Sequence, residues 1–123
     1  MPNIGKGFHV LLADDDPVSL EIETIILQSE GCSVEPVTTG LQAVEQALRH
    51  RFDVILLDWQ MPDLDGVTAA EEINRGGGTA PVILLTGGMA VLPPFPEASH
   101  IQGMLTKPLE AEDWRACLNE IFG

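Results

Sequence analysis

Short apolar runs alternate along the chain with longer segments whose apolar residues recur every three or four positions. The longer segments predict helices, and the first of them begins at Pro17 behind an Asp16 cap and stops at Gly31. The short runs predict five strands, at 8–13, 33–37, 53–57, 81–85 and 101–106. Parallel strands need crossover connections, and crossover helices cover both faces of a sheet. The sequence therefore predicts a doubly wound α/β fold with a parallel sheet.

The periodic segments also indicate where the helices lie. The second helix is marked by Leu41, Val44, Ala47 and Leu48, and the third spans 67–74. Pro36 cannot donate a hydrogen bond to a neighbouring strand, so strand 33–37 belongs at a sheet edge. The first helix is marked by apolar residues at helical spacing, Val18, Ile22, Ile25 and Ile26. The inner face of the last helix is expected to consist of Trp114, Cys117, Leu118, Ile121 and Phe122.

Size and charge limit the functions that the chain can have. A length of 123 residues fits one domain over 1–123, and no apolar run reaches the roughly 20 residues of a membrane span. Without a secretion signal, a soluble, cytoplasmic protein is expected. The net charge of −13 would repel a phosphate backbone, which argues against direct nucleic-acid binding. Cys32 and Cys117 show no metal-ligand spacing and are expected to be small buried hydrophobes.

Polar side chains follow four of the predicted strands. In doubly wound sheets, ligands bind beyond the carboxyl ends of the strands. These ends carry five residues that we expect to converge on one rim: Asp14, Asp15, Asp58, Thr86 and Lys107. An isolated aspartate at a strand end is commonly a turn former, and an isolated lysine is commonly solvated, but five such groups at one rim indicate a functional site.

The aspartates after Asp58 have a structural interpretation. Asp63 and Asp65 are expected to shape the turn into the third helix, and Gly66 is expected to adopt a backbone conformation that other residues avoid. Residues 61–72 partly match a calcium-binding EF-hand loop. Its first two positions are Met61 and Pro62, however, so calcium binding is rejected.

The five rim residues and their surroundings resemble the receiver domain of two-component response regulators. The similarity covers the whole chain, through "HVLLADDDP", "VILLDWQMPDLDG", "PVILLTGG" and "MLTKP". It implies a flavodoxin-like sheet in strand order 2-1-3-4-5. By resemblance, Asp58 is the phosphoacceptor, Thr86 is the switch hydroxyl and Lys107 contacts the phosphoryl group.

The resemblance also implies a Mg²⁺ cofactor, held by Asp14, Asp15, Asp58 and the backbone carbonyl of Gln60. Mg²⁺ prefers oxygen ligands and offsets the repulsion between an anionic phosphoryl donor and a carboxylate acceptor. The three histidines show no constellation, so the phosphohistidine must belong to a partner, a histidine kinase or a histidine phosphotransfer protein. The domain is expected to catalyse its own phosphorylation and dephosphorylation without being a conventional enzyme, either freestanding or within a hybrid sensor kinase.

Two departures from the family pattern concern the output of the signal. The aromatic residue that usually stands three positions before the lysine is replaced by Met104, whose flexible side chain should couple weakly to a switch. Segment 87–100, where the family has its fourth helix, contains three prolines that leave at most a short or distorted helix. An alternative is therefore a phosphorylation-independent interaction module with a receiver fold. A flavodoxin-like cofactor protein ranks well behind both, because the chain lacks a hydroxyl-rich phosphate loop after the first strand and has no tyrosine.

Overall fold

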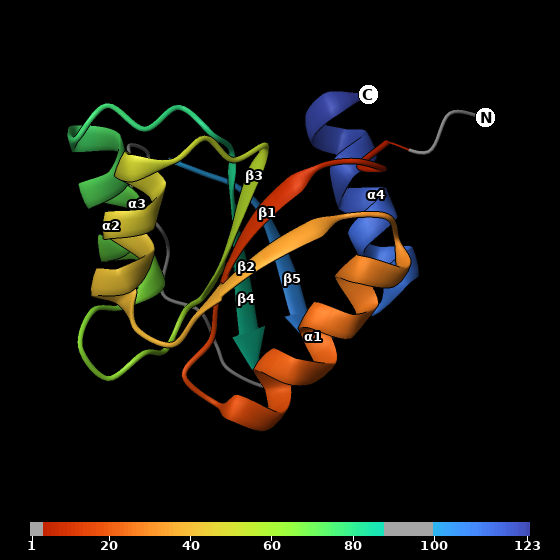
Figure 1. The fold of residues 1–123 in the computed structure, drawn as a ribbon, viewed down its shortest axis with the longest axis horizontal. Helices are drawn as coiled ribbons and strands as arrows, with labels where there is room; N and C mark the ends of the chain where they lie inside the picture. Colours follow the sequence, from red (N-terminus) through yellow and green to blue (C-terminus); the bar gives the residue numbers. More distant parts are fainter. Residues whose placement is uncertain (1–3, 88–99) are drawn as a thin grey trace.

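The computed structural model describes residues 4–87 and 100–123 and contains a five-stranded parallel sheet (Figure 1). The strand order β2-β1-β3-β4-β5 confirms the predicted topology, with β2 and its Pro36 at one edge. The elements follow one another as β1 (His9–Ala13), α1 (Pro17–Ser29), β2 (Ser33–Val37), α2 (Gly40–Arg49), β3 (Val54–Asp58), α3 (Gly66–Arg75), β4 (Val82–Gly87), β5 (Ile101–Lys107) and α4 (Ala111–Phe122).

The helices form two layers, with α1 and α4 on one face of the sheet and α2 and α3 on the other (Figure 1). Successive strand side chains point to opposite faces, so each strand contributes to two cores. Leu12 and Leu56 belong to the core beneath α1 and α4, whereas Leu11 and Leu57 belong to the core beneath α2 and α3. Trp114 is fully buried in the first core, as the sequence predicts for the last helix.

The side of helix α1 that packs against the sheet is not the side that carries most of its β-branched apolar residues. Val18, Ile22 and Ile25 are 64%, 50% and 57% exposed, whereas Glu23 and Leu27 are buried. Apolar residues lie on both sides of this helix, so their spacing predicts a helix but not which side is covered. Among the residues expected to face the core from α4, Phe122 is exposed and packs edge-to-face against Phe8 instead.

The turn that follows β3 differs in two details from the expectations. Asp65 shapes the turn into α3 as expected, and it does so as the N-cap, accepting a hydrogen bond from the Thr68 N–H at 2.9 Å. The carboxylate of Asp63, however, accepts hydrogen bonds from the N–H groups of Gly40 and Leu41, at 3.0 and 2.9 Å. Asp63 therefore holds the start of α2 rather than shaping the turn into α3.

Gly66 is also required for a different reason than expected. Its φ is not positive, but a Cβ at this position would lie 2.7 Å from the carbonyl oxygen of Asp58 and 2.5 Å from a methyl group of Leu84. The missing side chain thus lets α3 begin directly against the end of β3.

Two further expectations concern the chain as a whole. The expected distortion of a helix within 87–100 falls mainly on residues 88–99, which lie outside the described residues. Among the helices of the described segments, none is both long and apolar enough to cross a membrane.

Candidate functional site

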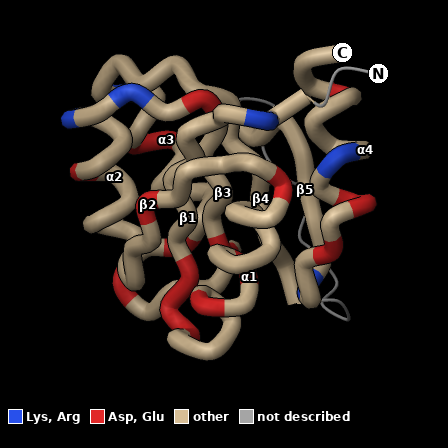
Figure 2. Tube along the Cα trace, turned by 45° about the vertical axis from the view of Figure 1, so that its right-hand side comes forward, with Lys and Arg blue, Asp and Glu red and all other residues tan. Residues whose placement is uncertain are grey.

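The carboxyl ends of β1 and β3 bring three aspartates together. Oxygen atoms of Asp14, Asp15 and Asp58 all lie within 4.8 Å of one another. Figure 2 shows acidic segments gathered where β1 leaves the sheet, at the lower end of the molecule. Asp14 and Asp58 are buried and Asp15 is exposed, so the cluster is open on one side only.

Lys107, the last residue of β5, bridges the two buried aspartates. Its Nζ lies 2.9 Å from Asp58 Oδ2, to which it donates a hydrogen bond, and 2.8 Å from Asp14 Oδ2. The contact with Asp14 is an ion pair without hydrogen-bond alignment, because Asp14 Oδ2 is a buried oxygen without a hydrogen-bond partner. One ammonium group therefore faces three carboxylates, and the site has an excess of negative charge.

The backbone fixes the remaining oxygens of these side chains. Asp14 Oδ1 accepts a hydrogen bond from the Asp16 N–H at 2.9 Å, and Asp58 Oδ1 accepts one from the Gln60 N–H at 3.2 Å. The carbonyl of Trp59 accepts the N–H of Gly66 at 2.9 Å. The end of β3 is thus held from its own turn and from the start of α3.

Burial and charge shift the pKa values in this cluster in opposite directions. Burial raises the pKa of Asp58, together with repulsion by Asp14, and Lys107 only partly offsets this. Burial acts in the same direction on Asp14, but the neighbouring Glu23 carboxyl, the Lys107 ammonium and the hydrogen bond from the Asp16 N–H outweigh it and lower the pKa of Asp14. Burial would lower the pKa of Lys107, yet its contacts with Asp14 and Asp58 raise it. Lys107 is therefore charged in this cluster.

An open cavity of about 460 Å³ gives access to the cluster. Its walls are Asp15, Asp58, Gln60, Met61, Pro62, Gly87 and Lys107. A larger cavity of about 560 Å³ lies at the opposite end of the strands, between the end of α2 and the loop before β4, and none of the described residues that line it is acidic. The smaller cavity is the candidate site, because it contains the carboxylates and the lysine.

Two of the residues singled out in the sequence lie apart from the ion pairs. Thr86 ends the buried part of β4 and is 3% exposed, but it takes part in none of the hydrogen bonds and ion pairs of the cluster in the described structure. Met104 is 44% exposed and lines a separate hollow between β5 and α4. The four charged residues therefore form the centre of the site, and Gln60 lies at its wall.

The sequence analysis missed Glu23, which lies behind Asp14. This glutamate of α1 is 3% exposed and is in hydrogen-bonding reach of the Asp14 carboxyl. Burial, with the neighbouring Asp14 charge, raises the pKa of Glu23 to about 9. The signal was present in the sequence, since Glu23 stands on the same helix side as Leu20 and Leu27, which pack into the core.

The donor set fits a hard divalent cation. Several clustered carboxylate oxygens, one of them buried without a hydrogen-bond partner, are the ligands that Mg²⁺ prefers. A cation there would offset the excess negative charge. Asp14, Asp15 and Asp58 are the residues that could hold it.

Comparison with known proteins gives the class to which this fold and site belong. Residues 10–119 match the model of the response regulator receiver domain. The chain is 35% identical over 114 residues to the transcription factor SKN7 of Saccharomyces cerevisiae, covering 92% of this chain and 18% of that protein. It is 37% identical over 106 residues to the signal transduction histidine-protein kinase BarA of Escherichia coli K12, covering 84% of this chain and 12% of that protein.

A solved structure with the same fold is the receiver domain of the sensor histidine kinase PA1611 from Pseudomonas aeruginosa PAO1. It has a TM-score of 0.78 and 30% sequence identity, and the match covers 92% of this chain and 95% of that one. That structure contains a magnesium ion coordinated in the active-site cleft. The chain spans less than a fifth of the length of SKN7 or BarA. It belongs to the response-regulator receiver domains of two-component signalling.

Proposed function

We propose that the chain is one receiver domain that accepts a phosphoryl group on Asp58 from a partner phosphohistidine, in a Mg²⁺-dependent reaction. The observation that carries this proposal is the cluster of Asp14, Asp15 and Asp58 around the Lys107 ammonium, at the mouth of an open cavity. Asp58 is the acceptor because it both lines that cavity and accepts a hydrogen bond from Lys107, whereas Asp14 is completely buried and Asp15 has no ion pair with Lys107 among the described residues.

The transfer exchanges one bond to phosphorus for another. The N–P bond of the phosphohistidine breaks, the imidazole nitrogen keeps its electron pair, and an O–P bond to the Asp58 carboxylate forms. Asp14, Asp15 and Asp58 would hold Mg²⁺, which would supply positive charge that offsets the repulsion between the anionic donor and acceptor. Lys107 donates to the phosphoryl oxygens. The Gln60 N–H and the close approach of Gly66 keep Asp58 in place, so little rearrangement is needed. The backbone carbonyl of Gln60 would be a further ligand of the cation, and Thr86 would act as the switch hydroxyl.

The phosphoryl donor is a histidine kinase or a histidine phosphotransfer protein. No histidine of this chain lines the acidic cavity. The exposed apolar residues Val18, Ile22 and Ile25 form a stripe along α1, and this helix begins three residues after Asp14. A helical partner that covers the stripe would bring its phosphohistidine to the same end of the molecule. We assign the α1 stripe to the docking of that partner.

Incubation with acetyl phosphate and Mg²⁺, followed by intact mass measurement, tests the acceptor. The expected result is one added phosphoryl group that requires Mg²⁺ and is absent from Asp58→Asn. Labelling that persists in Asp58→Asn, or that needs no divalent metal, would contradict the assignment.

The partner surface is tested by transfer from a phosphorylated histidine phosphotransfer protein. Ile22→Asp should slow this transfer by at least about tenfold while leaving labelling by acetyl phosphate unchanged, because a charge in an apolar contact costs more than about 1.4 kcal/mol. Leu48→Asp is the matched control, since Leu48 is similarly exposed but lies on α2. Equal slowing in both variants would exclude the α1 stripe as the docking surface.

One observation favours the phosphorylation-independent alternative. Met104 stands where the family has an aromatic residue that follows the switch threonine on activation, and it is exposed and lies outside the acidic cavity. A chain that takes up no phosphoryl group from either donor would be an interaction module with a receiver fold.

A further inference from the structure

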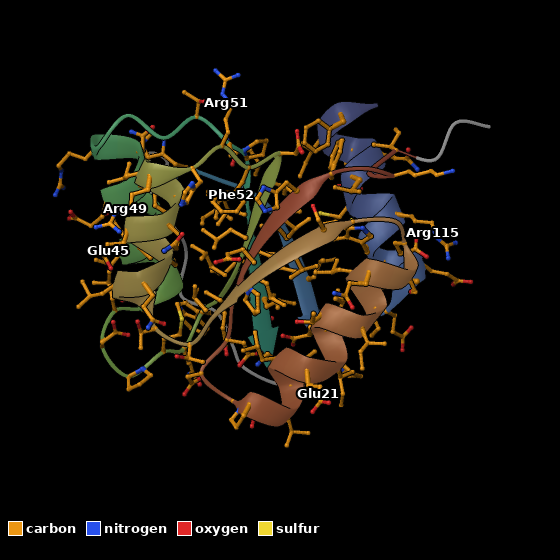
Figure 3. All side chains as sticks on the ribbon, viewed as in Figure 1. Glu21, Glu45, Arg49, Arg51, Phe52 and Arg115 are labelled. Atoms are coloured by element: carbon orange, nitrogen blue, oxygen red, sulfur yellow. The ribbon has the colours of Figure 1, made fainter. Side chains whose placement is uncertain are left out.

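Glu23 is the acidic side chain of α1 that faces the interior. Figure 3 shows Glu21, two residues earlier, pointing away from the body of the protein, whereas Glu23 is 3% exposed. A carboxyl group loses hydration on burial, and it is tolerated only with a hydrogen-bond partner. Glu23 Oε1 nevertheless has no N–H or O–H donor in the described structure. The group that it meets is the carboxyl of Asp14.

Asp14 also has a buried carboxyl oxygen that lacks a hydrogen-bond donor. Its Oδ1 is held by the Asp16 N–H, but its Oδ2 is buried and has only the unaligned ammonium of Lys107 beside it. A single hydrogen bond from the Glu23 carboxylic acid to Asp14 would satisfy both residues. Glu23 is buried and is not among the described residues that line the open cavity, so it contacts Asp14 from the protein side and does not obstruct the cavity.

We propose that Glu23 is a positioning residue for the metal-binding carboxylate of Asp14. This inference rests on the proposed Mg²⁺ site. Lys107 and a cation would compete for the carboxylates of Asp14 and Asp58. Asp14 therefore needs a different partner to keep its orientation when a cation binds. Glu23 and the Asp16 N–H hold Asp14 without taking part in that competition. Partners that orient a ligand in this way matter for metal affinity, and their loss typically weakens binding about 10- to 100-fold.

Calorimetric titration with Mg²⁺ tests the proposal. Glu23→Met removes the hydrogen-bond donor but keeps the length of the side chain, and we expect it to weaken Mg²⁺ binding roughly tenfold. Glu23→Gln keeps an N–H donor toward Asp14, and its affinity should stay within about twofold of the original protein. Glu21→Met and Glu21→Gln are matched controls on the exposed side of α1, and both should bind as the original protein does.

Rescue by glutamine separates positioning from packing. Equal or tighter Mg²⁺ binding by Glu23→Met would overturn the proposal, and so would equal losses in the Met and Gln variants. Glu23→Leu is a second donor-free variant should Glu23→Met not fold; if neither folds, Glu23 serves folding and the proposal is refuted. If the original protein binds no Mg²⁺, the proposed function itself fails. Tight binding by the original protein and by Glu23→Met refutes only the role of Glu23.

Discussion

Raising the pH should destabilise the metal-free protein through Glu23. The pKa of this carboxyl is about 9 in the folded protein, against an ordinary value of 4.5. Between these two values, the folded state holds a proton that the unfolded chain has released. The free energy of unfolding therefore falls as the pH rises through this interval, because the folded state binds more protons than the unfolded state.

The size of the effect follows from the linkage relation. One extra proton in the folded state changes the free energy of unfolding by about 1.4 kcal/mol per pH unit. From pH 6 to pH 8, Glu23 alone can therefore remove at most about 2.7 kcal/mol. This is a large part of the stability of an ordinary domain, which is about 5–15 kcal/mol.

Urea unfolding in the presence of EDTA, at constant ionic strength, measures this loss. Glu23→Gln cannot titrate, so its stability should fall less steeply with pH than that of the original protein. The substitution leaves all other residues in place, so their contributions cancel in the difference. Glu21→Gln is the control on the same helix and should keep the original slope. Equal slopes for the original protein and Glu23→Gln between pH 6 and 8 would refute the reasoning.

Three other predictions concern the turn after β3 and the acidic cluster. Gly66→Ala should destabilise the fold by about 1–3 kcal/mol, because its Cβ meets the Asp58 carbonyl, whereas the Cβ of Gly87→Ala meets no atom of the described residues within 4 Å and should be tolerated in the same urea titration. Asp63→Ala should cost about 1 kcal/mol, as for a lost helix cap, and a loss no larger than that of Glu45→Ala would count against this role. Mg²⁺ should raise the melting temperature at constant ionic strength by binding only the folded state; an equal rise in Asp15→Asn/Asp58→Asn would mean that the effect is not local.

The rim of the sheet could be predicted from the sequence because it depends on local patterns. Strand ends are visible in the alternation of apolar runs, and a parallel sheet brings those ends to one side whatever the details of packing. Asp14, Asp58 and Lys107 therefore meet where the sequence indicates. The N-cap functions of Asp16 and Asp65 were equally accessible, since a cap contacts the backbone two or three residues ahead.

The errors concern contacts between distant segments. Asp63 holds backbone groups 22 and 23 residues earlier in the chain, and no local pattern reveals such a partner. Gly66 is needed because the backbone of β3 passes close to it, which depends on how α3 packs. Glu23 was overlooked because an acidic residue on a helix is normally assigned to the solvent side.

Because side chains alternate along the strands, the two faces of the sheet differ in how freely their residues can be substituted. Asp14, Asp58 and Lys107 continue the side of the sheet that carries Leu12, Leu56 and Leu105, beneath α1 and α4. Helices α2 and α3 support the site through backbone contacts, at Gly40 and Gly66, and contribute none of the three side chains. Substitutions on the outer surfaces of α2 and α3 can therefore accumulate without altering these three side chains. Such a surface is available for new interactions during the divergence of related proteins.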